Sequence, residues 1–274
     1  MSLPRAQNIS SHRRGYVDGV WGQVHYREAG QGDPFVLIHQ VPWSSVQYHK
    51  VMAPLAAAGL RVIALDSPGC GMSDAADGYK TAEEFADNIA RALDGLGLDR
   101  VAITGHHTGA LLSPCFAARH PDRVSALVID NAPLWSAEER GEKQALTGSD
   151  TAIKSDGSHF TDRWERVRKL GDPDWSDESV QTAVLSFYNN GVHAEHAYWA
   201  AFRYDLIADL PKIACPTLLM AGAKDMLYSS AAKIRAIRPD FEYAELDGGV
   251  AMQLERPDYW AGPVIAFLKA QVLG

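Results

Sequence analysis

The sequence predicts an α/β protein whose mostly parallel sheet is flanked by helices and interrupted by a helical insertion. Two observations predict this class. Short apolar runs alternate with helical periodicity over residues 34–130, and the alternation returns over residues 216–273. Because strands and helices that alternate along a chain form right-handed crossovers, they build a parallel sheet. Residues 135–210, between these regions, offer helical periodicity without a convincing buried strand.

The expected elements follow from local patterns. Alternating runs separated by Gly22 indicate an antiparallel pair of strands, and continuous apolar runs indicate strands buried on both faces. Thr81 followed by Glu84 forms a capping box, which marks the start of an amphipathic helix. The strands are expected at residues 16–21, 23–28, 34–39, 61–65, 100–104, 124–130, 216–221 and 241–246, and the helices at residues 47–58, 81–93, 109–119, 229–237 and 259–273.

The length of the chain, 274 residues, permits one large α/β domain or two small ones. Both halves of the alternating pattern are needed to complete one sheet. We therefore expect residues 1–134 and 211–274 to form a single core, and residues 135–210 to form an inserted helical cap.

The composition excludes several classes of protein. A net charge of −8 argues against nucleic-acid binding, which needs a clustered basic face. No run reaches the roughly 18 apolar residues of a membrane-spanning helix, and the N-terminal residues lack a signal-peptide pattern. The three cysteines have no Cys-x-x-Cys spacing, and His193 and His196 lack a third nearby ligand. We expect a cytoplasmic protein without metal or cofactor, and its oligomeric state stays open.

Residues 105–109 read Gly-His-His-Thr-Gly between an expected strand and an expected helix. This Gly-x-nucleophile-x-Gly turn resembles the nucleophile elbow of the α/β-hydrolases, whose glycines allow a tight turn that lifts the central side chain above the sheet. Four further blocks resemble the family in order and spacing, at residues 39–43, 66–74, 221–225 and 246–257. The resemblance covers about residues 15–134 and 211–272. It implies an α/β-hydrolase sheet with a cap and a small-molecule substrate.

The sequence departs from the family at the residues that carry the chemistry. His107 stands where the elbow holds Ser, Asp or Cys, and Val250 stands where the last loop holds the histidine. The acid of the family is present as Asp225, and Gln40 replaces the glycine of the oxyanion loop. A Ser-His-Asp acyl-enzyme mechanism therefore cannot run with its usual members.

We hypothesise that His107 reaches over Val250 towards Asp225 and restores a histidine–carboxylate pair from the opposite side. The volume vacated on the last loop matches the volume that the imidazole requires at the elbow, as close packing demands. Asp225 would fix the tautomer, so that the other ring nitrogen serves as a base. Because a helix N-terminus disfavours imidazolium, we expect His107 to be neutral near pH 7.

Neighbouring residues complete the candidate site. The backbone N–H of Thr108, paired with that of Gln40 or Val41, is expected to form an oxyanion hole. The side chain of Gln40 either donates to the same ligand or plugs the hole. Asp130 is an alternative acid, although a hydrogen bond to a neighbouring loop is the preferred interpretation.

The substrate pocket is expected under the cap. We expect it to include Trp43, Trp135 and Val250. The cap is rich in aromatic residues, which favours a hydrophobic or aromatic ligand. His106, which precedes the centre of the elbow, is expected to be structural.

Three functions remain open. The first is a hydrolase of an ester, lactone or activated carbonyl, in which His107 and Asp225 act on water. The second is a lyase or another non-hydrolytic enzyme, in which the same base removes a proton from the substrate. The third is a protein that binds a small molecule without catalysis. Analogy with the fold's other members favours the first.

Overall fold

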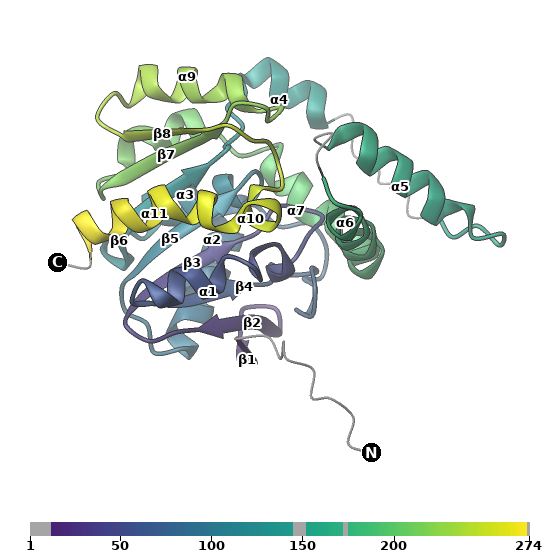
Figure 1. Ribbon diagram of the computed structural model, residues 1–274, viewed down its shortest axis with the longest axis horizontal. Coiled ribbons are helices and arrows are strands. Elements are labelled where there is room, and N and C mark those ends of the chain that lie inside the picture. Colours follow the sequence, from purple (N-terminus) through teal and green to yellow (C-terminus); the bar gives the residue numbers. More distant parts are fainter. Residues whose placement is uncertain (1–11, 145–151, 172–174, 273–274) are drawn as a thin grey trace.

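The computed structural model describes residues 12–144, 152–171 and 175–272. Its centre is a sheet with the strand order β1-β2-β4-β3-β5-β6-β7-β8 (Figure 1). The strands are β1 (Arg13–Asp18), β2 (Gln23–Ala29), β3 (Asp33–Ile38), β4 (Leu60–Leu65), β5 (Val101–His106), β6 (Val124–Asp130), β7 (Thr217–Gly222) and β8 (Glu242–Leu246). β2 runs antiparallel to β1 and β4, and the remaining neighbours are parallel. The predicted fold class is therefore confirmed.

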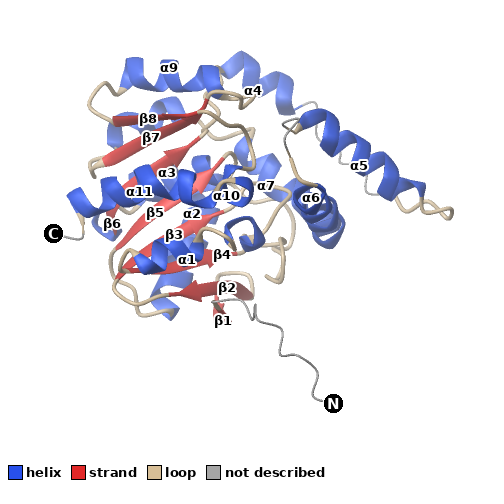
Figure 2. Ribbon diagram, in the orientation of Figure 1, coloured by secondary structure: helices blue, strands red, loops and turns tan. Residues whose placement is uncertain are grey.

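Helices cover both faces of this sheet (Figure 2). Those of the sheet-forming regions are α1 (Met52–Ala57), α2 (Ala82–Gly95), α3 (Gly109–Arg119), α9 (Tyr228–Ile237), α10 (Met252–Glu255) and α11 (Pro257–Gln271). Short 3₁₀ helices lie at Ser45–Tyr48, Pro121–Arg123, Gly191–His193 and Leu210–Lys212. The predicted capping box is present at the start of α2, where Thr81 Oγ1 accepts from the Glu84 N–H and Glu84 Oε2 accepts from the Thr81 N–H.

The two faces of the sheet form two separate apolar clusters. Along β3, Phe35 and Leu37 pack with residues of α1 and α11, whereas Val36 and Ile38 pack with residues of α2 and α3. Successive side chains of a strand point to opposite faces, so a continuous apolar run serves both clusters. Because both faces of these strands are buried, their sequences are continuously apolar and do not alternate between apolar and polar residues.

One expected helix is wrong in its extent. Residues 47–58 were expected to form a single helix, but a 3₁₀ turn, Ser45–Tyr48, is followed by the short α1, which begins only at Met52. Pro54 explains the break, because it lacks an N–H and its ring would clash with the carbonyl of Lys50 in a continuous helix. In the structure Pro54 lies in the first turn of α1, where proline is tolerated.

Between β6 and β7 the described residues contain helices and no strand. These are α4 (Ala137–Gln144), α5 (Ser158–Leu170), α6 (Asp177–Asn190), α7 (Ala194–Ala201) and α8 (Leu206–Asp209). We call the described part of residues 135–210, which holds α4–α8, the insertion. Figure 1 shows α5 and α6 standing beside the sheet, away from α1 and α11. In the part of the chain that is described, no helix has the length and apolar character needed to cross a bilayer.

Candidate active site

His107 lies at the turn between β5 and α3, and its backbone is unusual. Its φ angle is +49°, in the left-handed region that residues other than glycine seldom occupy. The flanking glycines are required by close approach. A Cβ atom at Gly105 would lie 1.9 Å from the carbonyl oxygen of Gly109, and one at Gly109 would lie 2.0 Å from that of Ile38. The turn therefore has the geometry that the Gly-x-His-x-Gly pattern predicts.

The side chain of His107 makes the predicted contact with Asp225. Nε2 of His107 lies 2.8 Å from Oδ2 of Asp225, and the Asp225 side chain is fully buried. The other carboxylate oxygen, Oδ1, accepts a hydrogen bond of 2.8 Å from the backbone N–H of Leu227. Asp225 is thus held from two sides and points at the elbow from the loop that follows β7.

The protonation states of the pair follow from burial and neighbouring charge. Burial lowers the pKa of His107, the adjacent His106 lowers it further, and Asp225 only partly offsets these effects. Burial raises the pKa of Asp225, but His107, His106 and the hydrogen bond from the Leu227 N–H together outweigh burial, and the net pKa lies below its ordinary value. At neutral pH the pair is a neutral imidazole and a carboxylate. Because a carboxylate only accepts, Nε2 carries the proton and Nδ1 carries the lone pair.

The carboxylate of Asp130 contacts the ring of His106, and only the backbone carbonyl of Asp130 accepts from the N–H of His107. Its Oδ2 accepts from Gln253 at 2.7 Å and from Trp260 at 2.8 Å, and it lies 2.9 Å from Nδ1 of His106. Both Asp130 and His106 are fully buried. The ring of His106 stacks on that of His107 with centroids 4.3 Å apart. A second histidine–carboxylate pair, His106 and Asp130, therefore packs against the first pair through the stacked imidazole rings. This agrees with the structural interpretation of His106.

A possible metal site is formed by three side chains whose ligand atoms lie within 4.8 Å of one another, those of His106, His107 and Asp225. The two imidazole planes are stacked at an interplanar angle of 18°. Nitrogen lone pairs lie in the ring planes, so a single ion cannot lie in both of these separated planes at once. The cluster is better suited to proton transfer than to ligation.

The structure of the oxyanion loop differs from the expectation in one respect, the availability of the Gln40 N–H. The backbone N–H of Gln40 donates to Oε1 of Gln47 at 2.9 Å, so it is not free to bind a substrate oxygen. This leaves the N–H groups of Val41 and Thr108 as the candidate donors. The hydroxyl of Tyr198, on α7, donates to the carbonyl of Val41 at 2.8 Å and ties the loop to the insertion.

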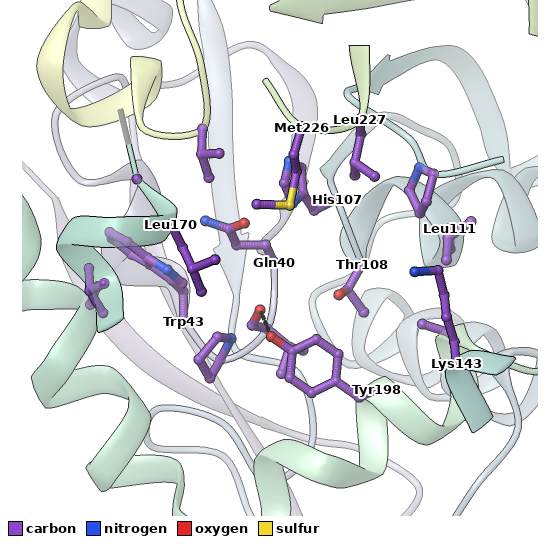
Figure 3. A pocket seen from close by; sticks show the side chains of 18 of the residues that line it. Gln40, Trp43, His107, Thr108, Leu111, Lys143, Leu170, Tyr198, Met226 and Leu227 are labelled. Atoms are coloured by element: carbon purple, nitrogen blue, oxygen red, sulfur yellow. Dashed lines mark hydrogen bonds between the residues drawn. The ribbon is translucent and has the colours of Figure 1, made fainter. Parts of the chain in front are cut away.

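A cavity of about 320 Å³ lies next to His107 and is lined by both the sheet-forming regions and the insertion. Gln40, Thr108 and His107 border it, as Figure 3 shows. The lining includes Trp43, Trp135 and Val250, the three residues that were expected there.

Sequence reasoning missed three basic residues that line the same cavity, namely Lys143, Arg163 and Arg166. A signal for two of them exists in the sequence. Residues 163, 166, 167 and 170 follow the spacing of one helical face, and all four line the cavity from α5. Charged residues on an amphipathic helix usually face solvent, which is why they did not stand out.

Comparisons with known proteins agree with this architecture. A family model described as alpha/beta hydrolase fold matches residues 33–257. The chain is 25% identical over 260 residues to proline iminopeptidase from Heyndrickxia coagulans, covering 85% of this chain and 86% of that protein. It is 32% identical over 124 residues to haloalkane dehalogenase 2 from Mycobacterium tuberculosis, covering 45% of this chain and 43% of that protein. The crystal structure of the enol-lactonase from Burkholderia xenovorans LB400 superposes with a TM-score of 0.80 at 21% identity, covering 93% of this chain and all of that one.

Proposed function

Because the chain belongs to the α/β-hydrolase fold family, we propose that it hydrolyses a small hydrophobic or aromatic ester, lactone or activated carbonyl without a serine nucleophile. In this proposal His107 and Asp225 act as a general-base pair on water. One observation carries it, the 2.8 Å contact between Nε2 of His107 and Oδ2 of Asp225, at the position where the family places its nucleophile.

The chemistry follows from the protonation states. Nδ1 of the neutral His107 accepts a proton from water, and the resulting hydroxide attacks the carbonyl carbon of the substrate. The Asp225 carboxylate stabilises the imidazolium that forms. The backbone N–H groups of Val41 and Thr108 stabilise the oxyanion of the tetrahedral intermediate. The imidazolium then returns the proton to the leaving group as the carbon–oxygen bond breaks.

In the same proposal the insertion acts as a cap over the reacting groups. Aromatic side chains from it, including Trp135, Trp175 and Phe202, line the cavity together with Trp43. Such a wall excludes water around the substrate and strengthens the electrostatic interactions inside. The volume of the cavity lies near the lower end of the range of about 300–1,000 Å³ for ligand pockets, which favours a small substrate.

The test is hydrolysis of 4-nitrophenyl acetate by the wild-type protein and by His107→Asn. Asparagine tolerates the left-handed backbone of the elbow but supplies no base. We expect the variant to lose roughly 10²-fold to 10⁴-fold in kcat/KM, and we expect a fluorophosphonate, which phosphonylates the nucleophile of serine hydrolases, to leave the wild type unaffected. His120→Asn is the matched control, because His120 also contacts a carboxylate, that of Asp87 at 2.9 Å, outside the cavity.

Three other outcomes would overturn the proposal. Equal activity of wild type and His107→Asn would remove His107 from the reaction, and inhibition by the fluorophosphonate would reveal a serine nucleophile. Exchange of a substrate proton with solvent deuterium, without net hydrolysis, would assign the base to a non-hydrolytic reaction instead.

A further inference from the structure

The cavity beside His107 has an electrostatic character opposite to that of the whole chain. The chain carries a net charge of −8. Three cationic side chains, Lys143, Arg163 and Arg166, nevertheless line the cavity, and among the residues that the structure describes no acidic one lines it. All three come from the insertion, Lys143 from α4 and the two arginines from α5. Like charges that face one cavity repel each other, so their gathering there favours a negatively charged occupant.

Arg163 is the most informative of the three. Its Nε is buried and has no hydrogen-bond partner among the described residues. The guanidinium lies over the ring of Phe187, with its central carbon 3.5 Å from the ring centroid, and forms no ion pair within the part of the chain that is described. Burial lowers its pKa, which reflects the cost of keeping this cation partly away from water. A bound anion would offset that cost and satisfy the fork of donors.

Lys143 lies on another side of the same cavity. Figure 3 shows its side chain pointing into the cavity from the side of Leu111 and Thr108. Its Nζ lies 4.8 Å from the centroid of Trp135, and it forms no ion pair within the described ranges of the chain. Lys143 therefore offers a point charge close to an aromatic wall, a combination that suits an aromatic acid.

The arginines also act near the oxyanion loop. Burial raises the pKa of Tyr198 to about 12, and the positive charges of Arg163 and Arg166 oppose this shift. The hydroxyl of Tyr198 donates to the carbonyl of Val41, so these charges lie near the loop that borders the reacting groups. An anion held by the arginines would consequently lie in the same cavity as the group to be hydrolysed.

We infer that the cavity binds a small aromatic molecule that carries a carboxylate, with Arg163, Arg166 and Lys143 as its cationic partners. Calling this molecule the substrate depends on the proposed function, whereas the preference for a carboxylate does not. Planar guanidinium groups match a carboxylate with two parallel hydrogen bonds. The aromatic residues of the lining hold the ring, and the chemistry of His107 takes place at a second, uncharged group of the same molecule.

The test measures binding of phenylacetate, 3-phenylpropanoate and benzoate, each against its neutral amide, by isothermal titration calorimetry on the full chain. Each acid and its amide have nearly the same shape and differ in charge. We expect at least one acid to bind roughly tenfold to hundredfold more tightly than its amide, and the difference to shrink as ionic strength rises. Equal affinities for all three pairs, or no measurable binding of any acid at millimolar concentration, would overturn the inference.

Variants assign the effect to the named side chains. Arg163→Gln and Lys143→Gln should each reduce the affinity for the acid and leave that for the amide unchanged. Arg203→Gln and Lys169→Gln are matched controls, because these residues of the insertion are exposed and do not line the cavity. Unchanged acid binding in both Arg163→Gln and Lys143→Gln, with unchanged melting temperatures, would contradict the assignment.

Two further measurements separate the possible failures. Inorganic phosphate at matched ionic strength tests for general anion binding, and displacement of the aromatic acid with equal affinity would contradict the carboxylate assignment. His107→Asn should retain the preference for the acid over the amide, because the cations are intact. If that preference is present while hydrolysis of 4-nitrophenyl acetate does not depend on His107, the proposed function fails and the inference stands. If hydrolysis depends on His107 but no acid binds more tightly than its amide, the inference fails and the proposed function stands.

Discussion

At the scale of single residues, His107 combines an unfavourable backbone conformation with a side chain that is hydrogen-bonded through Nε2 to a buried carboxylate. A residue other than glycine in the left-handed region costs of the order of 1–3 kcal/mol and persists only where its surroundings hold it. Here the φ angle of +49° directs the imidazole towards the buried carboxylate of Asp225. The lowered pKa of His107 keeps the ring neutral, which is the form that a base requires.

The pH dependence of the activity should report this pKa. Since only the neutral imidazole accepts a proton, kcat/KM should fall as pH decreases through the pKa of His107, which lies below the ordinary value of 6.5. Above that value the rate should be independent of pH until other groups titrate. A pH profile of 4-nitrophenyl acetate hydrolysis checks this, and an inflection attributable to His107 above pH 6.5 would contradict it.

The individual residues differ in how well the sequence predicts them. The contact between His107 and Asp225 is predictable, because both residues follow strands of a known order and the exchange of volume with Val250 leaves room for the ring. The unavailability of the Gln40 N–H is not, because it depends on where the side chain of Gln47, seven residues later, comes to lie. To predict the basic lining of the cavity, one would need to know which face of α5 faces the cavity.

At the scale of elements, the turn from β5 to α3 allows only glycine at positions 105 and 109, two residues before and two residues after His107. The carbonyl oxygens of Gly109 and Ile38 occupy the space that a Cβ atom would need. The first strand, expected at residues 16–21, is β1 (Arg13–Asp18), because the chain turns over residues 19–22, where the N–H of Gly19 donates to the carbonyl of Gly22. The other boundaries are close to those that the sequence predicts, and α3 has the predicted bounds, Gly109–Arg119. The helix expected over residues 47–58 fails because periodicity does not register the missing N–H of Pro54.

Alanine substitutions at two helical glycines should have opposite effects on stability. Gly109→Ala places a Cβ atom 2.0 Å from the carbonyl oxygen of Ile38, so the turn must shift and the free energy of unfolding should fall by more than about 1 kcal/mol. Gly141→Ala, in α4, meets no heavy atom within 4 Å and should stabilise the protein by about 0.5–1 kcal/mol. Urea denaturation measures both, and equal effects would refute the steric argument.

At the scale of the whole molecule, the site joins parts of the chain that are far apart in sequence. The loop after β3, the elbow after β5, the loop after β7 and the segment before α10 all border one cavity, which residues of the insertion also line. The sheet order brings these segments to the carboxyl ends of parallel strands, where such folds bind ligands. Alternation of strands and helices predicts this part of the arrangement well. The depth and charge of the cavity depend on packing of the insertion, which local patterns do not determine.

Exchanging the two altered positions should restore the family's usual arrangement. In His107→Ser combined with Val250→His, the serine takes the elbow and the new imidazole enters the space that His107 leaves next to Asp225. We predict covalent labelling by a fluorophosphonate, detected by mass spectrometry of the intact protein. Each single variant lacks one partner and serves as the control. Absence of labelling in a double variant that retains the wild-type melting temperature would show that the two positions do not share one space.

Chemical rescue tests the central claim most directly. His107→Gly suits the left-handed backbone and leaves a space the size of an imidazole beside Asp225. We predict that added imidazole restores 4-nitrophenyl acetate hydrolysis in a saturable manner, above the rate of imidazole without protein, and that Asp225→Asn in the same background abolishes this gain. A rate that imidazole leaves unchanged, or that it raises equally in both variants, would contradict the assignment of His107 and Asp225 as the catalytic base.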